Sequence, residues 1–482
     1  MSNNSRFYFI LLSVLSAAGV GNIFIYPNLS AKFGGLFFIP YLIAMIVLGV
    51  PLLMLEFSIG QHFDKNVVDI FASVKKWFSG IGWLMMINAF IIMSIYTVVL
   101  AWNIIYIFVS FGLQWKGNER NYFLSNVVQA SGGLNGFTKF SLPVFIALVI
   151  VWAIIFFYVR NGFDSIMKCF LIMAPAFLVL ALFFLYYTLT IQNALNGVYF
   201  FLNPGWAKLL DWQAWSGAFL LAALSLGVSF GIMPAVSRRS KTGFAFGNSF
   251  FVIVFKLMIS MIIGIIVFSI IGFLGARQNI GLEGLSSSGY GFPFITLAQA
   301  LPFFYSPALL SILFFTMLFM LLLFGASSLA YSLVHILSEK LSTKRRNAAI
   351  VVAGLGFLSG LLFVIKPGLH IMDIVSHFVA YNILLAVLLE SVAAGWFYNS
   401  EKLSGFVNKN SAIKIGGVWR FFIRFIIPII VIVIIAIHIK SDFGLDYNSY
   451  PLWAILSFGI GTVAIPVATA FLLPEKILDR KG

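Results

Sequence analysis

The first apolar segment of this chain is interrupted in its middle. Residues 8–30 read YFILLSVLSAAGVGNIFIYPNLS, and a helix of about 20 residues suffices to cross a bilayer. Gly19, Gly21 and Asn22 lie inside this segment, and Pro27 follows them. Such residues weaken a helix where no water can satisfy the freed carbonyls. Breaks of this kind are tolerated where they are buried in protein or line a cavity, and in secondary transporters they mark the ion and substrate site.

The composition of the whole chain indicates a membrane protein. Of its residues, 61% are hydrophobic and 9% are charged, whereas a soluble protein carries about 25% charged residues. The apolar runs are long and continuous, unlike the short alternating strands of a β-barrel. We predict an all-α integral membrane protein with about twelve transmembrane helices. The expected spans are 8–30, 36–61, 82–112, 141–159, 163–190, 213–236, 246–275, 308–338, 347–365, 370–398, 418–439 and 450–473.

The remaining segments limit other interpretations. Residues 290–303 are apolar but short and contain prolines, which predicts a re-entrant or interfacial piece. The single cysteine, Cys169, excludes an internal disulfide and a multi-cysteine metal site. The polar connections near 113–140 and 399–417 are too short for a soluble domain. No intramembrane metal cluster, Ser-Lys pair or paired Asp motif points to an enzyme.

The net charge of +15 is explained by membrane topology rather than by nucleic-acid binding. With both termini on the cytoplasmic side, 21 of the 30 Lys and Arg residues lie inside and eight lie outside. Lys256 is the remaining one, within the seventh span. This asymmetry follows the positive-inside rule. We expect the protein in the plasma membrane, or in the inner membrane of a Gram-negative cell, with the lipid bilayer and a small molecule as its partners.

Six segments resemble one family of transporters, in the same order along the chain. They are SAAGVGNIFIYP, then FGGLFFIPYLIAMIVLGVPLLMLEFSIGQ, YTVVLAW (96–102), GVYFFLNPGWAKLLDWQAW, LSLGVSFG (224–231) and GASSLA (325–330). These segments are similar to the signatures of the neurotransmitter:sodium symporter family, whose members take up amino acids and amines.

The resemblance implies a LeuT-like fold in one transmembrane domain, residues 1–482. Two inverted five-span repeats, about 8–190 and 213–398, are followed by two extra helices at about 418–473. The first helix of each repeat is interrupted in that fold. Residues 19–22 and 225–231 are the interrupted cores at corresponding positions. An interrupted helix leaves free N–H groups and free carbonyls, which hold a carboxylate and a desolvated cation.

The resemblance places the substrate between these two interruptions. Gly21 and Gly227 let the substrate approach the backbone, and Tyr96 donates its hydroxyl to a substrate carboxylate. Ala222 and Val228 stand where many relatives carry aromatic residues, which leaves room for a bulky apolar or aromatic amino acid. The expected substrate-binding residues are Ala17, Gly21, Tyr96, Ala222, Ser225, Gly227, Val228, Lys256 and Ser328.

Of the two sodium sites usual in the family, the second fits this sequence. The expected ligands are the carbonyls of Leu15 and Ala18, the hydroxyls of Ser327 and Ser328, and a further carbonyl from Leu323. Oxygen-only ligands suit a hard alkali cation. The alternative is that the two serines are small residues that only pack helices.

The first sodium site is altered in this chain. Asn22 is present, but Ala223 replaces an expected hydroxyl residue and Lys256 replaces an expected Asn. A lysine within a span costs roughly 2.5–3.5 kcal/mol and marks a functional position unless it snorkels to water. We predict that the Lys256 ammonium takes the place of the first sodium. Burial favours the neutral amine and a substrate carboxylate favours the charged form, so this lysine is also able to couple protons.

The outer gate departs from the family as well. Ile25 stands where relatives carry an Arg, and the partner position in span ten falls near Ser376 or His377, about a turn after Asp373. We therefore expect outer closure by apolar packing that includes Tyr96 and Phe230, without a gating salt bridge on Asp373.

Two other functions stay open. A proton-coupled or exchange carrier on the same fold gains weight from Lys256, and a membrane amino-acid sensor that does not transport is the alternative from another class. Ser260, four residues after Lys256, occupies a position where chloride-dependent relatives carry Ser. The sequence leaves open the chloride dependence, the particular amino acid or amine, the stoichiometry and the formation of homo-oligomers.

Overall fold

The computed structural model describes a helical chain. It covers residues 3–17, 19, 21, 24–203, 206–238, 245–281, 289–408, 414, 416–442 and 447–472. Across these ranges the regular structure is helical, and extended backbone forms only one isolated bridge, between Phe140 and Ile365. The prediction of an all-α protein is confirmed.

Ten helices in the described part of the chain are long and apolar enough to cross a membrane. They coincide with ten of the expected spans. In three of them, Phe38–Phe63, Gly417–Ser441 and Leu452–Leu472, a π-helical turn joins two shorter helices. The ten helices are Phe38–Phe63 (α3 and α4), Lys76–Val109 (including α6, Ser79–Val109), Leu142–Val159 (α8), Phe163–Leu189 (α9), Ala245–Gln278 (α13), Pro307–Lys340 (α15), Arg345–Val364 (α16), Gly368–Phe397 (including α17, Gly368–Val392), Gly417–Ser441 (α19, Gly417–Phe421, and α20, Ile427–Ser441) and Leu452–Leu472 (α21 and α22).

The other two expected spans are each divided into two helices. The segment 8–30 forms α1 (Asn3–Ser16) and α2 (Ile25–Phe33), and the segment 213–236 forms α11 (Trp212–Leu226) and α12 (Ile232–Ser237). Each of these helices is shorter than the roughly 20 residues that a bilayer requires. Both interruptions therefore lie where the sequence predicts them, while the total of twelve spans and the inverted repeats stay predictions.

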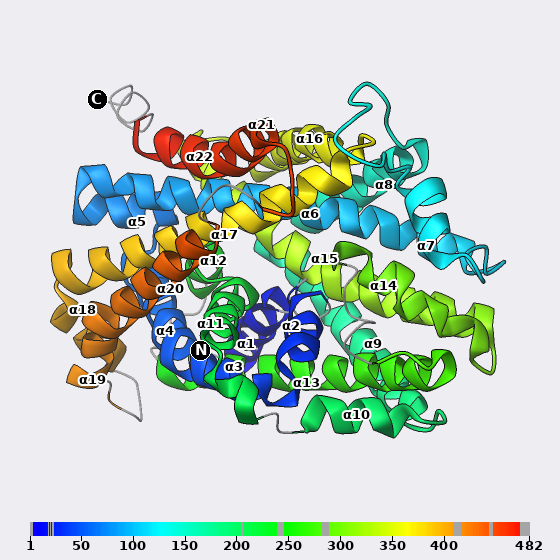
Figure 1. Cartoon of the computed structure of the whole chain (residues 1–482). Helices are drawn as coiled ribbons and strands as arrows, with labels where there is room; N and C mark the ends of the chain where they lie inside the picture. Colours follow the sequence, from blue (N-terminus) through cyan, green and yellow to red (C-terminus); the bar gives the residue numbers. More distant parts are fainter. Residues whose placement is uncertain are drawn as a thin grey trace.

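The interrupted helices lie at the centre of the molecule, with longer helices around them (Figure 1). Helix α6 contacts α15, α8, α16, α17 and α22. Of the residues in the most apolar 18-residue stretch of Lys76–Val109, 67% are buried. In the corresponding stretch of α9, 22% are buried. Helix α6 is therefore a core helix, whereas α9 presents most of its surface outward.

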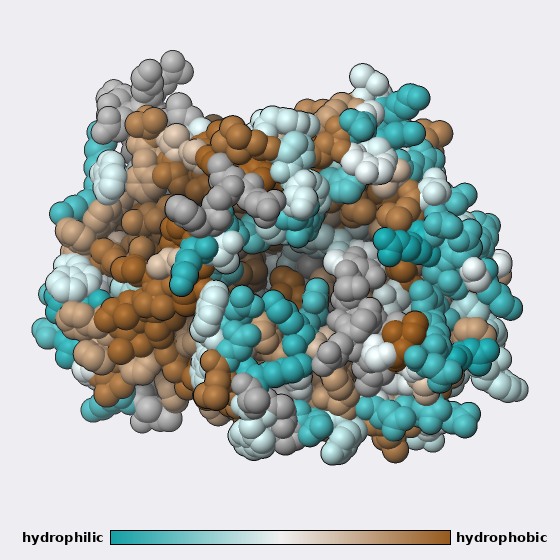
Figure 2. All heavy atoms as spheres, viewed as in Figure 1, coloured by the Kyte–Doolittle hydropathy of each residue, from teal (hydrophilic) through white to brown (hydrophobic). Residues whose placement is uncertain are grey.

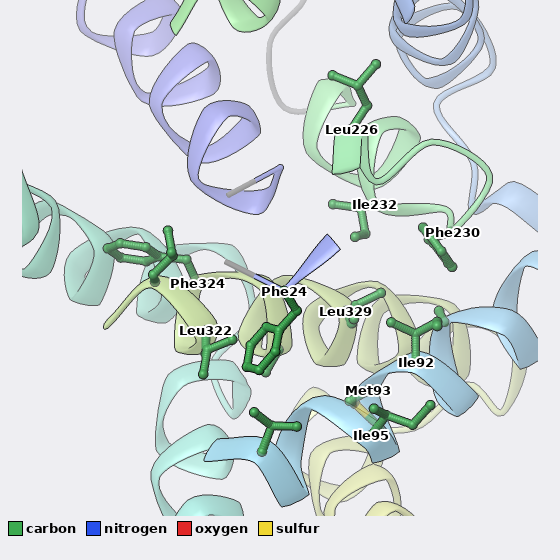
Figure 3. Packing of buried hydrophobic residues seen from close by; sticks show 14 of the residues in the cluster. Phe24, Ile92, Met93, Ile95, Leu226, Phe230, Ile232, Leu322, Phe324 and Leu329 are labelled. Atoms are coloured by element: carbon green, nitrogen blue, oxygen red, sulfur yellow. The ribbon is translucent and has the colours of Figure 1, made fainter. Parts of the chain in front are cut away.

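Hydrophobic side chains fill the space around the first interruption. Phe24, which precedes α2, lies among side chains of α6 and α15, and residues beside the second interruption face the same region (Figure 3). These buried side chains belong to one core that runs through most of the chain. The core holds the ends of the short helices in place, because a densely packed interior resists displacement.

Short helices connect the long ones. Residues 289–303 form 3-10 turns on either side of α14 (Phe292–Ile295), in keeping with the short piece predicted for 290–303. The remaining connections include α5 (Val67–Val74), α10 (Ala194–Leu202) and α18 (Ser400–Asn408). Cys169 is a free thiol.

Candidate substrate and ion site

The first interruption packs directly against α11. Helix α1 ends at Ser16, and α2 begins at Ile25. A Cβ added to Gly21 would lie 3.3 Å from the Cδ1 of Leu221 and 3.3 Å from the Cβ of Ser225. Only glycine therefore lets the backbone come this close to α11 without displacing those side chains.

Two of the predicted residues at this interruption, Ala18 and Asn22, fall outside the described residues. Ala17 is described: it is buried, and its N–H donates to the Ser13 carbonyl at 3.1 Å. Leu15 lies in the last turn of α1, where helix carbonyls lack partners within the helix.

The second interruption is a run of left-handed backbone. Gly227, Ser229 and Gly231 have φ angles of +67°, +60° and +68°, which end α11 and reset the chain before α12. Glycine adopts these angles without strain, whereas Ser229 does so at a cost. A Cβ on Gly227 would lie 4.0 Å from the carbonyl oxygen of Ser16. The two interruptions therefore meet, and their backbone groups share one buried region.

Tyr96 of α6 lies against the first interruption. A Cβ on Gly19 would approach the Tyr96 hydroxyl to 3.0 Å, and a Cβ on Gly325 would approach the Tyr96 ring to 3.0 Å. The phenol ring thus fits between two glycines, one on each neighbouring segment. The predicted wall residues Ala222 and Val228 are buried at the other interruption.

The predicted sodium ligands of α15 face the end of α1. The hydroxyls of Ser16 and Ser328 lie 2.7 Å apart, and Ser328 also donates to the Phe324 carbonyl at 2.8 Å. The hydroxyl of Ser327 is buried and has no hydrogen-bond partner among the described residues. Leu323 is buried one turn before Ser327. A buried hydroxyl without a partner is uncommon, and an oxygen-rich place of this kind fits a sodium ion.

Lys256 is buried within α13 and does not reach the surface. Its side chain has 0% exposure, and its Nζ lies 3.2 Å from the Oγ of Ser260. The Ser260 hydroxyl in turn donates to the Lys256 carbonyl at 3.0 Å. A snorkelling lysine requires an ammonium in contact with water, which this geometry does not provide.

A chain of hydroxyls joins Lys256 to the second interruption. Tyr41 of the span Phe38–Phe63 interacts with the hydroxyl of Ser260, and its own hydroxyl lies 3.1 Å from that of Ser225 on α11. Ser225 is the residue against which Gly21 packs. Ala223, the predicted replacement of a sodium ligand, is buried nearby on α11 and offers no side-chain oxygen.

Two glutamates, Glu56 and Glu390, converge on Ser229. The sequence motifs did not single out this serine. The Ser229 N–H donates to Glu56, and the Ser229 hydroxyl donates to Glu390 at 2.9 Å. The two carboxyl groups also interact with each other, and both are buried. They hold the strained turn between α11 and α12 against two long helices.

A cleft of about 620 Å³ leads from the surface toward the interruptions. A recess is visible near the middle of the face drawn in Figure 2. Residues from α2, from most of the length of α11, from α17 and from α20 line the cleft. They include Phe24, Ile25, Ser216, Leu221, Leu224, Asp373, Ser376, His377 and His438.

Asp373 forms no ion pair among the described residues. It accepts hydrogen bonds from the hydroxyls of Tyr447 and Tyr450, at 3.4 and 3.1 Å, and from the amide of Asn448 at 3.1 Å. Neutral donors therefore surround this carboxylate. That outer closure uses no salt bridge on Asp373 stays a prediction.

A hydrogen-bonded contact lies at the rim of the cleft. Asp442, just past the end of α20, lies 2.7 Å from His377 Nε2 and accepts from the hydroxyl of Tyr381 at 2.7 Å. Burial alone would raise the pKa of the Asp442 carboxyl, but these two partners outweigh it and hold the pKa below its ordinary value. The pair joins α17 to the end of α20.

Phe230, expected to take part in outer closure, lies away from the cleft. Phe230 is buried and does not line the cleft, and its carbonyl accepts from the hydroxyl of Ser332 on α15 at 3.0 Å. The left-handed turn carries this residue past the interruption, to the end of the site away from the cleft. The sequence motif alone does not reveal how far the turn advances the chain.

Ion pairs close the opposite end of the site. Arg238, just after α12, lies 2.6 Å from Asp64 and also pairs with Glu339 of α15. Burial opposes the charge of Arg238, but the two carboxylates outweigh it and raise the pKa of its guanidinium. Lys340 pairs with Asp69 of α5. The site is thus open toward the cleft and closed by charged pairs at the other end.

The comparison with known proteins agrees with this architecture. Residues 2–121 and 114–475 match the sodium:neurotransmitter symporter family. A protein of Methanocaldococcus jannaschii described as an uncharacterized sodium-dependent transporter is 30% identical over 492 residues, which cover 99% of this chain and 98% of the relative.

Animal relatives are similar over nearly the whole chain. Sodium-dependent nutrient amino acid transporter 1 of Drosophila virilis is 27% identical, with 97% of this chain and 82% of the relative covered. The creatine transporter of Torpedo marmorata is 24% identical, with 92% and 80% covered. The chain therefore belongs to the sodium:neurotransmitter symporter family and is a multi-pass membrane transporter, not an enzyme.

Proposed function

We propose that the protein is a sodium-coupled symporter of amino acids or related small amine solutes. The observation that supports this most strongly is the meeting of the two interruptions, where Gly227 approaches the Ser16 carbonyl and Gly21 approaches Ser225. Helix ends of this kind offer N–H groups to a carboxylate and carbonyls to a cation.

One sodium ion binds between α1 and α15. The carbonyls of Leu15, Ala18 and Leu323 and the hydroxyls of Ser327 and Ser328 are its ligands. The orphaned hydroxyl of Ser327 supports this assignment, because a bound cation would satisfy it. When bound, the ion stabilises the carbonyl end of α1 and so favours the arrangement that receives the substrate.

Lys256 takes the place of the other sodium ion of the family. Its burial, and the hydroxyl chain that leads from it through Ser260 and Tyr41 to Ser225, support this role. A fixed ammonium at this position would balance the substrate carboxylate, as an ion does in relatives with Asn at the same place. Chloride is then unnecessary for charge balance.

The substrate is a bulky apolar or aromatic amino acid. Ala222 and Val228 are small walls beside the second interruption, and a pocket with smaller walls accepts a larger side chain. The names of the Drosophila relatives, which are nutrient amino acid transporters, are in keeping with an amino-acid substrate.

Transport follows alternating access. The open cleft and the ion pairs of Arg238 and Lys340 at the opposite end correspond to a state that is open to the outside and closed to the cytoplasm. Spans 1, 2, 6 and 7 then move against spans 3, 4, 8 and 9, and both chain termini lie in the cytoplasm of a cell with this protein in its plasma membrane.

Uptake into liposomes tests the proposal. Purified protein is reconstituted and supplied with radiolabelled tryptophan, leucine or glycine, under either a sodium gradient or a pH gradient without sodium. We expect uptake of tryptophan or leucine, driven by sodium and well above uptake of glycine. Equal uptake without sodium, or glycine far above tryptophan, would contradict the assignment.

A proton-coupled carrier is the second candidate, favoured by the buried Lys256 alone. The same experiment separates the two, because a proton-coupled carrier accumulates substrate under the pH gradient with sodium absent. Binding of substrate without transport under either gradient would instead identify a sensor.

A further inference from the structure

A groove separate from the substrate cleft lies beside the end of α17. Its volume is about 430 Å³, and none of its residues line the cleft. It is formed by the π-helical turn Ala393–Phe397, by α18 and by the start of the span Gly417–Ser441. Its lining residues are Gly395, Tyr398, Asn399, Ser400, Glu401, Gly417, Arg420, Phe421, Arg424 and Phe425.

Arg424 is exposed in this groove although it lies inside a span. It follows Gly417, where the span begins, by about two turns or about 10 Å. Its guanidinium lies 4.7 Å from the Trp396 ring and 6.0 Å from the Phe425 ring, and within the described ranges it pairs with no carboxylate. An arginine beside lipid is costly unless its charge reaches the headgroup region and finds an anion there.

The position of Arg424 is fixed by backbone contacts. The Trp396 indole N–H donates to the Arg424 carbonyl at 2.9 Å. A Cβ on Gly395 would lie 3.0 Å from the Arg424 Cα, so glycine allows this close approach. Beyond this fixed backbone, the Arg424 guanidinium lies against the rings of Trp396 and Phe425.

A second arginine in the groove is only partly neutralised. Arg420 donates to Glu401 at 2.6 Å, and the two side chains are 33% and 77% exposed. Glu401 is the one acidic residue in 399–424, which contains five Lys and Arg. The groove therefore carries an excess of positive charge on the side that the topology assigns to the cytoplasm.

The surroundings of the groove are apolar. Trp396 and Phe421 are 52% exposed, and Ile429 and Ile432 on the next turns are 56% and 53% exposed. Hydrophobic residues gather over α20 in Figure 2, and hydrophilic residues lie beside them at the edge where α18 and α19 lie (Figure 1). Positive charge next to an apolar surface suits a ligand with an anionic head and acyl chains.

We propose that this groove binds an anionic phospholipid from the cytoplasmic leaflet. Arg424 and Arg420 hold its phosphate, Trp396 lies at the headgroup level as interfacial tryptophans do, and the acyl chains extend over Phe421, Phe425 and Ile429. This site is independent of the ion and the substrate that the transporter carries.

Lipid retention tests the site. Protein purified from liposomes of equal phosphatidylglycerol and phosphatidylcholine is examined by native mass spectrometry. We expect preferential retention of phosphatidylglycerol and a fall of about fivefold in Arg424→Gln, the factor that one basic residue contributes to anionic-lipid binding. Arg424→Lys retains part of the preference. The matched control is Arg277→Gln. Arg277 also lies over an aromatic ring, 3.8 Å from that of Phe303, but in the last turn of α13 and outside the groove.

Three outcomes would overturn the proposal. Retention of phosphatidylglycerol in Arg424→Gln equal to that in the wild type and in Arg277→Gln excludes the site. Thermal stabilisation by inorganic phosphate equal to that by phosphatidylglycerol assigns the groove to a free anion. A dimer that dissociates in Arg424→Gln, with no lipid retained in the wild type, assigns this face to a second copy of the chain.

Discussion

The hydroxyls of Ser16 and Ser328 lie 2.7 Å apart and join the last turn of α1 to the middle of α15. This contact fixes the carbonyl end of an interrupted helix next to Ser327, whose buried hydroxyl has no partner among the described residues. The proposed sodium site is therefore built from a broken helix on one side and an unbroken helix on the other.

Replacing Ser327 with Ala weakens sodium binding. The variant removes one proposed ligand, and a lost interaction with a charged group costs about 1.5–3 kcal/mol. We expect the sodium concentration for half-maximal binding to rise by at least about tenfold, measured by equilibrium binding of radioactive sodium. Ser311→Ala is the matched control, because Ser311 is buried in the same helix and, among the described residues, its hydroxyl bonds only to the Pro307 carbonyl of that helix. Equal sodium affinity in both variants would argue against this site.

Replacing Lys256 with Met removes the fixed charge. We expect substrate uptake to fall by at least about tenfold and its dependence on pH to disappear, because the ammonium that balances the substrate carboxylate is lost. Uptake is measured from pH 5.5 to 8.5 with the amino acid that wild type transports best. Normal uptake with an unchanged pH profile in Lys256→Met would exclude this role.

Replacing Gly19 with Ala displaces Tyr96. The added Cβ would lie 3.0 Å from the Tyr96 hydroxyl, which is too close, so the phenol or the interrupted backbone must shift. We expect kcat/KM for uptake to fall by about tenfold or more, as small displacements at a binding site do. Gly354→Ala serves as the control, since a Cβ there has no neighbour within 4 Å. Unimpaired uptake in Gly19→Ala would remove Tyr96 from the site.

Replacing Asp442 with Asn destabilises the rim of the cleft in a pH-dependent manner. The pKa of Asp442 is held below its ordinary value of 3.8 by His377 and Tyr381, against the opposing effect of burial. The stabilisation is fully present above pH 3.8 and is lost as the pH falls through the lowered pKa. We expect the variant to lose about 1.5–3 kcal/mol of stability at pH 7, seen as a lower unfolding temperature, and the difference to narrow near pH 3. A difference that does not change with pH would mean that the carboxylate charge is not responsible.

The interruptions of the first and sixth expected spans could be predicted from the sequence because their causes are local. Glycines within an apolar run weaken a helix wherever they occur, and both breaks follow from that. The position of Lys256 within a span is equally visible, because a long apolar run flanks it on both sides.

Relationships between distant residues could not be predicted in the same way. Glu390 lies 161 positions from Ser229, and only the packing of α17 against the turn after α11 brings them together. The location of Phe230 depends on the left-handed φ angle of Ser229, which redirects the chain, and residue types alone do not predict that angle at a serine. The groove at Arg424 depends on a π-helical turn that has no signature in the sequence.

The stoichiometry of sodium binding tests the central claim most directly, and it requires no knowledge of the substrate. Equilibrium dialysis of the purified protein with radioactive sodium should give one ion per chain in the wild type. The same ion should half-saturate at a concentration at least about tenfold higher in Ser327→Ala. A second ion should bind when Lys256→Asn is combined with Ala223→Ser, which together restore the amide and the hydroxyl usual in the family. Two sodium ions per wild-type chain would contradict the account, because Lys256 would then not occupy the place of the first ion.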